Sequence, residues 1–431
     1  MTATLIAFAA LFGLLFLGLP LVFALGLVGF AGFAILVDFG PAAALVGNVA
    51  WDTLTSYTLS VLPLFLLMGN LVNHAGLSRE LYDASNAFVG HRKGGLAIAT
   101  IMACGGFSAV CGSSLATAAT MARIAIPSMR RLGYSKEIAA GSVAAGGTLG
   151  ILIPPSTILV IYGGMTNTNI GQLFIAGVLP GMLAIVLYIA ALTGYLFLKP
   201  SSAERVPALP WRERFRAFRK VWAVLVLFVF VIGGIYAGVF TATEAAGIGA
   251  FGAFVIAALR GSLTLRDLFQ IFRETAQATA ILMAVLVGAM IFSGFVNVAG
   301  IPQASVAAIR ALDASPTQVI LLLLVFYLIL GAVFDSMAMV LLTVPVFFPL
   351  TQSMGIDPVW FGIFVVVCVE ISLITPPIGM NLFIIRSIAR EIEMSAIIRG
   401  IVPFVIADLV RVGLIILFPA IVLFLPATMA R

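Results

Sequence analysis

G-I-L-I-P-P-S at 150–156 and S-L-I-T-P-P-I at 372–378 lie at the centre of two matching stretches of this sequence. Their proline pairs are 222 positions apart, since 154 matches 376 and 155 matches 377. The same offset relates two further pairs of residues, Pro127 with Pro349 and Gly133 with Gly355. The chain therefore contains an internal repeat, and each copy places a Pro-Pro pair inside an apolar run.

The composition is that of a protein embedded in a membrane. Of 431 residues, 62% are hydrophobic and only 9% are charged. Runs of about 20 apolar residues, the length needed to cross the hydrocarbon core, recur along the chain. These runs are continuously apolar, whereas the strands of a membrane barrel alternate. We expect an all-α polytopic membrane protein. The net charge of +6 fits basic cytoplasmic loops rather than nucleic-acid binding.

Two apolar runs contain a polar turn, at 94–130 and at 317–349. The first is interrupted by C-G-S-S at 111–114, and the second turns near 331–336. Basic residues flank the first run at both ends, and basic residues favour the cytoplasmic side. Each run is predicted to be a re-entrant helical hairpin. Such a turn is tolerated at membrane depth only where protein or water surrounds it.

The most basic segment divides the chain into two repeats. The predicted boundaries are 1–200 for the first repeat, 201–220 for a cytoplasmic linker and 221–431 for the second repeat. A helix broken by Pro-Pro is expected at about 137–164 in the first repeat and at about 359–385 in the second. About eleven spans plus the two hairpins are expected. An odd number of passes per half makes the repeats inverted, and inverted repeats with broken helices indicate a secondary transporter.

The Pro-Pro pairs leave backbone carbonyls without hydrogen-bond donors at each break. Proline has no N–H, so it leaves the carbonyl four residues earlier without a donor. The freed carbonyls are those of Gly150, Ile151, Ser372 and Leu373. Ile153 and Thr375 precede a proline and are expected to leave helical geometry. Carbonyls at membrane depth suit a desolvated Na⁺, and the N-terminus of the restarted helix suits an anion.

Charged residues inside apolar runs are functional candidates by default because burial of charge in a membrane is costly. Asp335, at the second predicted turn, is the strongest candidate. Glu370 is either a ligand or a structural hydrogen-bonding residue. Glu244 follows T-A-T and is expected to cap a helix. Arg386 is expected to anchor the chain at the membrane interface, with contact to a substrate carboxylate as the alternative.

Four motifs resemble the large membrane subunit of tripartite ATP-independent periplasmic (TRAP) transporters. They are G-G-F-S-A-V-C-G-S-S-L-A-T-A-A-T-M at 105–121, G-G-T-L-G-I-L-I-P-P-S-T-I-L-V-I-Y-G at 146–163, T-A-T-E-A-A-G-I-G-A at 241–250 and E-I-S-L-I-T-P-P-I-G-M-N-L-F at 370–383. The resemblance covers nearly the whole chain. One departure is Ala242, where the family usually has proline, and it is expected to affect only a helix start.

The resemblance implies an elevator-type transporter in the bacterial inner membrane with Na⁺ as coupling ion and no other cofactor. The first implied Na⁺ site comprises Ser108, Gly150, Ile153 and Pro155. The second comprises Gly331, Ser372, Thr375 and Ile378. The candidates for substrate contact are Ser113, Ser114, Asp335, Ser336 and Asn381. The implied partners are a small four-span membrane subunit and a periplasmic binding protein, which delivers a carboxylate or sugar acid.

Other functions are also open at this point. A stand-alone symporter for a dicarboxylate or another anion, coupled to Na⁺ or H⁺, needs no binding protein. In a proton-coupled version, Asp335 or Glu370 carries the proton. An intramembrane enzyme is disfavoured because both histidines lie at span ends and no H-E-x-x-H motif is present. The chain has no phosphate-binding G-x-x-x-x-G-K-[ST] loop, which argues against an ATP-driven pump.

Overall fold

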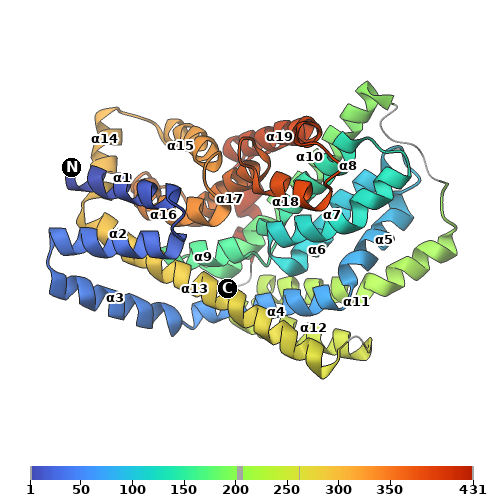
Figure 1. Cartoon of the computed structure of the whole chain (residues 1–431), viewed down its shortest axis with the longest axis horizontal. Coiled ribbons are helices and arrows are strands. Elements are labelled where there is room, and N and C mark those ends of the chain that lie inside the picture. The colour runs from blue at the N-terminus through green and yellow to red at the C-terminus, as the bar shows by residue number, and fades with distance from the viewer. Residues whose placement is uncertain (1, 201–206, 262, 430–431) are drawn as a thin grey trace.

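The computed structural model describes residues 2–200, 207–261 and 263–429, and every regular element in these ranges is a helix (Figure 1). The first half contains α1 Thr2–Phe16, α2 Leu21–Leu36, α3 Phe39–Leu54, η1 Thr58–Ser60, α4 Val61–His74, α5 Leu77–Val89, α6 Gly95–Cys111, α7 Ser114–Arg131, α8 Lys136–Thr148, η2 Leu149–Ile151, α9 Thr157–Thr166 and α10 Ile170–Leu198. The second half contains α11 Trp211–Tyr236, α12 Ala242–Leu259, α13 Leu265–Val298, α14 Ile301–Ala311, α15 Pro316–Gly331, α16 Ser336–Ser353, α17 Pro358–Ile374, α18 Met380–Ile388, α19 Met394–Leu417 and α20 Ala420–Thr428.

The N-terminal apolar run forms two helices, α1 and α2, rather than one kinked span. The chain turns at Gly18, whose φ of 84° is left-handed, and Pro20 directly precedes α2. Glycine adopts such a φ without a steric penalty, and proline is favoured at a helix start. The two helices pack against each other.

Two helices are longer than the sequence indicated. α13 runs without interruption through 34 residues, from the charged stretch 265–274 into the apolar stretch that follows it. A capping box between Thr264 and Asp267 fixes its start, and no proline or glycine follows until Gly288. α11 begins at Trp211, so the second half of the predicted linker is helical. Residues 201–206 of that linker lie outside the described ranges.

A helix–turn–helix pair occupies each predicted hairpin: α6 with α7 in the first half and α15 with α16 in the second. The members of each pair pack against each other. A broken helix follows each pair. In the first, α8 is separated from α9 by residues 149–156, and in the second α17 is separated from α18 by residues 375–379. The placement of these elements relative to the bilayer stays a prediction.

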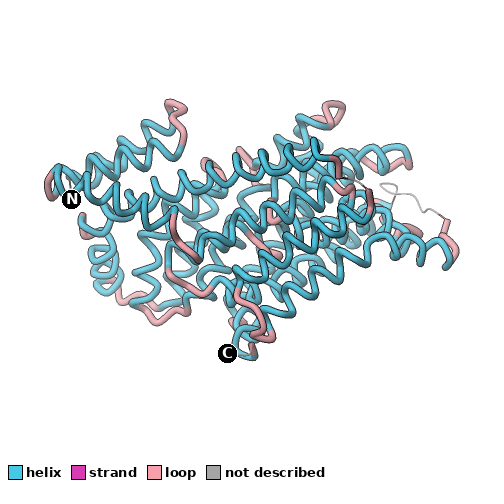
Figure 2. Tube along the Cα trace, turned by 90° about the horizontal axis from the view of Figure 1, so that it is seen from below, coloured by secondary structure: helices cyan, strands magenta, loops and turns pink. Residues whose placement is uncertain are grey.

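The buried side chains form two hydrophobic cores. One is built mainly from α2, α4, α9, α13 and α15–α17, and the other mainly from α5–α8, α18 and α19. Each broken helix therefore has one part in each core. Figure 2 shows the same arrangement from below, with loops confined to short connections between helices. The two breaks lie at the border between the two cores.

Six described helices are long and apolar enough to cross a membrane: α10, α11, α12, α13, α16 and α19. The count reaches seven if α3 and the η1–α4 segment, bent by 55°, form one span. This is fewer than the eleven or so spans expected, because breaks divide other apolar runs into helices of 10–17 residues. An all-helical polytopic membrane protein is thus confirmed.

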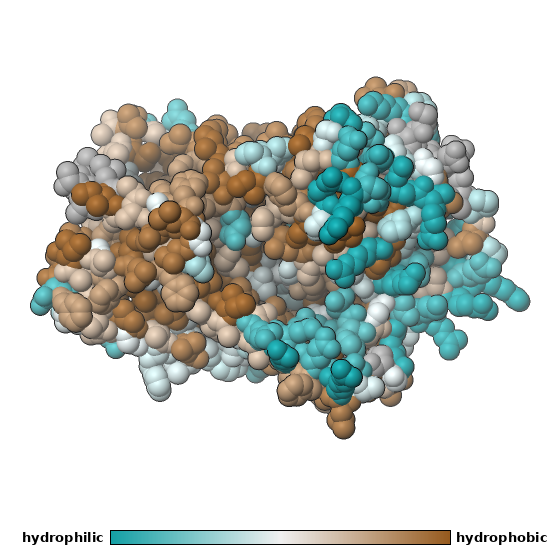
Figure 3. All heavy atoms as spheres, viewed as in Figure 1, coloured by the Kyte–Doolittle hydropathy of each residue, from teal (hydrophilic) through white to brown (hydrophobic). Residues whose placement is uncertain are grey.

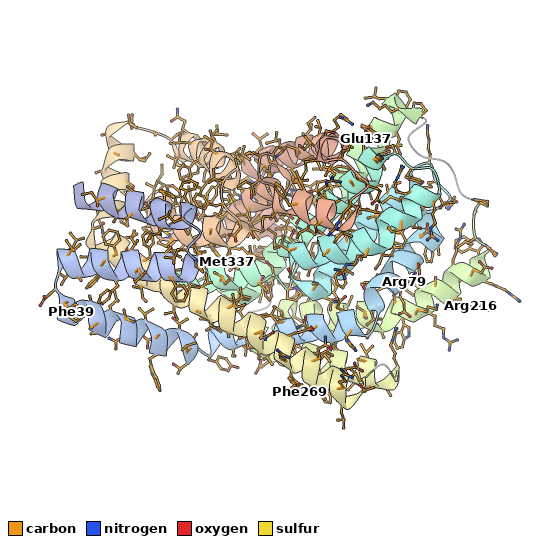
Figure 4. The ribbon with its side chains drawn as sticks, in the orientation of Figure 1. Phe39, Arg79, Glu137, Arg216, Phe269 and Met337 are labelled. Carbon is orange, nitrogen blue, oxygen red and sulfur yellow. The ribbon has the colours of Figure 1, made fainter. Side chains whose placement is uncertain are left out.

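Charged residues gather at one end of the molecule. Figure 3 shows hydrophilic residues concentrated on the right, whereas hydrophobic residues cover the opposite end around α1–α3. Arg79 of α5, Glu137 of α8 and Arg216 of α11 all lie toward the hydrophilic end, and Phe39 of α3 lies at the other (Figure 4). The basic first turns of α11 belong to this hydrophilic end (Figure 1).

Candidate functional site

The turn between α6 and α7 lies directly on the first break. A Cβ atom built on Gly112 would lie 2.6 Å from the carbonyl oxygen of Pro155, and one built on Gly150 would lie 2.6 Å from that of Ser113. The Thr157 hydroxyl donates a hydrogen bond of 3.1 Å to the Gly112 carbonyl. Gly112 also has a left-handed φ of 62°. Glycine is therefore required at both contacts, because any side chain would separate the turn from the break.

The first broken helix ends and restarts at defined residues. The Pro154-Pro155 peptide bond is cis, and Ser156 caps α9 by accepting from the backbone N–H of Leu159 at 3.3 Å. The Ser156 hydroxyl also donates to the carbonyl of Ile151. Of the two carbonyls that the sequence predicts to be freed here, the one of Ile151 thus already accepts a hydrogen bond.

Ser108 stands out among the predicted residues of this first half-site, which comprises Ser108, Gly150, Ile153 and Pro155. Its side chain is fully buried, and its hydroxyl has no hydrogen-bond partner among the described residues. A buried hydroxyl without a partner costs free energy, and such groups in native proteins call for an explanation. Ile153 and Pro155 are buried as well. A bound ion is one group that satisfies such a hydroxyl.

The second half-site, comprising Gly331, Ser372, Thr375 and Ile378, has the same design. A Cβ atom on Gly331 would collide with the side chain of Ser372, so the end of α15 lies against the end of α17. Thr375 is extended, with φ −95° and ψ 128°, which confirms that it leaves helical geometry. Its hydroxyl donates to the carbonyl of Ile371 at 2.6 Å. Ile378 lies half-buried within the break.

Asn381 joins the second broken helix to the first helix pair. It is fully buried on α18, and its amide nitrogen lies 3.1 Å from the Ser114 hydroxyl of α7 and 3.1 Å from the Ala144 carbonyl of α8. In the other direction, α9 packs against α16 and α17. Each restarted helix therefore packs against the helix pair of the other half, and Ser114 and Asn381 are brought together.

The other candidates for substrate contact have local roles. Asp335 is exposed and caps α16 by accepting from the backbone N–H of Ala338 at 2.7 Å. Ser113 caps α7 by accepting from the N–H of Ala116 at 3.4 Å. Ser336 is half-buried at the first position of α16. Asp335 is thus a helix cap at the tip of the pair, and its charge faces outward.

Two of the remaining charged candidates are held by their own segments. Glu244 forms a capping box with Thr241 at the start of α12, as the sequence predicts, and Ala242 is the first residue of that helix. Arg386 donates to the carbonyl oxygens of Arg390 and Ile392 at the end of α18. Neither contact involves the two half-sites.

Sequence reasoning missed part of a buried ionic cluster. Glu370 forms an ion pair with Arg411, and Arg411 forms another with Asp408. All three side chains have no exposed surface. The signal was present in the sequence, since D-L-V-R at 408–411 places two charges inside the last long apolar run. Charge inside an apolar run makes Asp408 and Arg411 functional candidates, as it does Glu370.

A polar cavity lies away from the two half-sites. It has a volume of about 1120 Å³ and is lined by residues from η1, the ends of α9 and α11, and the starts of α10, α12 and α17. Its polar lining includes Asn167, Gln172, Thr243 and Asp357. This cavity meets α9 at the end opposite to the Pro-Pro break.

Comparison with known proteins places the chain in a family. Residues 8–421 match the model described as "Tripartite ATP-independent periplasmic transporter, DctM component". A relative from Pseudomonas aeruginosa, named as the large permease protein of a C4-dicarboxylate TRAP transporter, is 38% identical over 93% of both chains. The large permease protein of a sialic acid TRAP transporter from Vibrio cholerae is 34% identical over 96% of both.

The solved structures support the fold. The YdaH transporter of Alcanivorax borkumensis aligns with a TM-score of 0.66, covering 89% of this chain and 90% of that one. Sequence identity is only 17%, so this likeness concerns the fold alone.

The family model itself describes one component of a tripartite system, which implies a periplasmic binding protein and a small subunit as partners. The chain belongs to the DctM family of TRAP transporters, and it is the multi-pass large permease of a bacterial transport system rather than an enzyme.

Proposed function

We propose that this permease imports a small organic acid by secondary active transport, driven by a Na⁺ gradient. The named substrates of its relatives support the substrate class. They are C4-dicarboxylates in Pseudomonas aeruginosa, sialic acid in Vibrio cholerae and ectoine in Halomonas elongata. Each of these small molecules carries a carboxylate. A carboxylate or sugar acid is therefore the proposed cargo.

Sodium binds at the two half-sites in this proposal. The observation that carries it is the buried Ser108 hydroxyl, which has no partner among the described residues and lies one helical turn before the Gly112 turn. Gly150 lies against that turn, which brings the α8–α9 break close to it. Gly331 and Ser372 make the matching contact in the second half. Oxygen ligands of this kind suit a hard cation.

The substrate carboxylate binds between the half-sites. Asn381 and Ser114 supply buried polar groups there, and α9 and α18 begin at the breaks with N–H groups that favour negative charge. Ser113 and Ser336 lie at the starts of α7 and α16 and supply further hydroxyls. Asp335 fits this role less well, because its exposed carboxylate repels an anion and already caps α16.

Transport follows an elevator mechanism in this proposal, with inverted repeats and a re-entrant pair in each. Both helix pairs and both broken helices interlock through the contacts of α9 and α18, which supports their movement as one body. A periplasmic binding protein delivers the substrate, and a small four-span subunit completes the membrane complex. The membrane is the bacterial inner membrane, with the basic start of α11 on the cytoplasmic side.

The experiment is uptake into proteoliposomes that contain the membrane complex, with binding protein and candidate acids added outside. We expect uptake only with an inward Na⁺ gradient. The variant Ser108→Ala should raise the half-saturating Na⁺ concentration about tenfold, because one ligand is lost. Ser142→Ala is the matched control: Ser142 is equally buried but donates to the Ile138 carbonyl at 2.8 Å.

Three results would contradict parts of this proposal. Uptake that follows pH and ignores Na⁺ means that the coupling ion is a proton. Uptake that needs no binding protein means that the chain works as a stand-alone symporter. Equal Na⁺ dependence in Ser108→Ala and Ser142→Ala removes Ser108 from the ion site.

A further inference from the structure

A buried polar cluster connects four helices beside the two breaks. It consists of Thr148 on α8, Tyr188 on α10, Glu370 on α17, and Asp408 and Arg411 on α19. None of the five side chains has exposed surface. The four helices that carry them pack against one another. The cluster is therefore sealed inside the protein, away from both water and lipid.

The contacts of this cluster form one continuous chain. The Thr148 hydroxyl lies 3.1 Å from the Tyr188 hydroxyl, and Tyr188 donates to the Asp408 carboxylate at 2.8 Å. Asp408 forms an ion pair of 2.9 Å with Arg411 Nη2. The same nitrogen lies 2.8 Å from Glu370 Oε2. Thr148 at the end of α8 is thereby joined to Glu370 near the end of α17.

The two ends of this chain are equivalent in the sequence repeat. Thr148 and Glu370 are 222 positions apart, the offset of the two Pro-Pro pairs. Tyr188 and Arg411 are 223 positions apart, the offset that relates Pro180 to Pro403 in the same helices. Each repeat therefore contributes one residue before its break and one partner from its following long helix. Asp408 links the two pairs.

Both ends lie next to the proposed ion ligands. Thr148 precedes Gly150 by two residues, and Glu370 precedes Ser372 by two residues. The backbone between them is short, so a shift of either side chain moves a carbonyl of the corresponding half-site. None of the five side chains belongs to the proposed ligand sets. They are positioning residues for both half-sites.

The charges make this cluster rigid. Two carboxyl groups share one guanidinium inside the protein. Removal of one partner from a buried ion pair is strongly destabilising, because the other charge is left without compensation. A displacement of one charged member therefore costs free energy unless its partners move with it.

We propose that Thr148, Tyr188, Asp408, Arg411 and Glu370 form a bridge that couples the two Na⁺ half-sites, so that an ion at one raises the affinity of the other. This inference rests on the proposed Na⁺ coupling. It adds a cooperative link between the sites and assigns that link to specific side chains. Two coupled sites give a Hill coefficient between one and two for Na⁺, whereas independent sites of equal affinity give one.

The test compares Thr148→Val with Thr148→Ser in the purified membrane complex. Valine keeps the branched shape but removes the hydroxyl that contacts Tyr188, and serine restores that hydroxyl. The readout is equilibrium binding of radiolabelled Na⁺ to the complex as Na⁺ replaces K⁺ at constant ionic strength. In the wild type and Thr148→Ser we expect a Hill coefficient near two. In Thr148→Val we expect a Hill coefficient near one, with about a fivefold rise in the half-saturating Na⁺ concentration.

A second variant covers the case in which Thr148→Val does not fold. Tyr188→Phe keeps the aromatic ring, which packs edge-on against Phe404 with centroids 5.6 Å apart, and removes only the hydroxyl. The same fall in Hill coefficient is expected. A merely structural role would lower the unfolding temperature in Na⁺ and K⁺ alike and leave the Hill coefficient unchanged.

The outcomes separate this inference from the proposed function. If the wild type shows no response to Na⁺, the proposed Na⁺ coupling is wrong, and there are no Na⁺ sites for the bridge to couple. If the wild type responds to Na⁺ with a Hill coefficient of one, the sites are independent and the inference is overturned. The inference is also overturned if a folded hydroxyl-deletion variant keeps both the wild-type Hill coefficient and the wild-type half-saturation.

Discussion

Single atoms decide the contacts at the two half-sites. Gly331 has no side chain, and for that reason α15 reaches Ser372 at the end of α17. Gly112 and Gly150 allow the same approach in the first half. Sequence reasoning could select these glycines by their position near the breaks. It could not show what they touch, because the contacts join segments that are distant in the chain.

At Gly331, one methyl group is expected to abolish coupling. In Gly331→Ala the added Cβ collides with the Ser372 side chain, so either the turn or the break has to move. Na⁺-dependent uptake should fall at least tenfold. Gly233→Ala is the matched control, since nothing lies within 4 Å of a Cβ at this position in α11. Full activity in Gly331→Ala would show that the close approach is not needed.

At Arg411, loss of charge should cost about 3–5 kcal/mol of stability, because Glu370 is left buried without a partner and Asp408 keeps only the Tyr188 hydroxyl. Arg411→Leu is therefore expected to reduce the folded yield and the unfolding temperature. Arg399→Leu provides the control. Arg399 pairs with Glu137 at 3.2 Å but is 62% exposed, and such surface pairs contribute about 0–1 kcal/mol. If both variants lost similar stability, burial would not be what makes the Arg411 ion pairs important for folding.

At the scale of elements, the broken helices follow from the sequence and the long helices do not. Each Pro-Pro pair predicted a break, and α8 and α17 end beside those pairs. α13 begins with charged residues at 265–274, a pattern typical of a surface helix, yet no residue there stops the helix before the apolar stretch that follows. Asn381 was selected without a known partner, since Ser114 and Ala144 lie more than 200 residues away in sequence.

Repair of a break should uncouple the transporter. In Pro376→Ala with Pro377→Ala, two N–H donors return, and α17 can continue through the present break into α18. The Ser372 carbonyl, which now accepts only the Thr375 N–H at 3.3 Å, and the Leu373 carbonyl then accept helical hydrogen bonds and are no longer available to an ion. Na⁺-dependent uptake is expected to disappear. Pro403→Ala in α19 is the control, because this proline lies within a continuous helix. Unchanged Na⁺ dependence in the double variant would refute the carbonyl assignment.

At the scale of the whole molecule, charge and hydropathy define an axis. α5 and the basic start of α11 lie at one end, and the apolar N-terminal helices extend to the other. The distribution of basic residues predicted that the linker at 201–220 lies on the cytoplasmic side. The division into two cores was beyond sequence reasoning, because apolar runs of similar composition supply both.

This axis predicts which residues a membrane-impermeant thiol reagent reaches. Arg216→Cys on α11 should react in inside-out vesicles and not in spheroplasts, because basic residues favour the cytoplasm. Phe39→Cys, at a position 67% exposed near the opposite end, should react from the other side. The unmodified chain, with its own three cysteines, measures the background. Labelling of both variants from one side would reject the proposed orientation.

The contact of Asn381 with Ser114 and Ala144 also has a consequence for biosynthesis. A ribosome makes the chain from its N-terminus, so α7 and α8 enter the membrane long before α18 exists. Until then the Ser114 hydroxyl and the Ala144 carbonyl lack the amide that they contact in the finished protein. Water, lipid headgroups or the insertion machinery must serve as temporary partners. The first half of the permease is completed only when nearly nine-tenths of the protein has been synthesised.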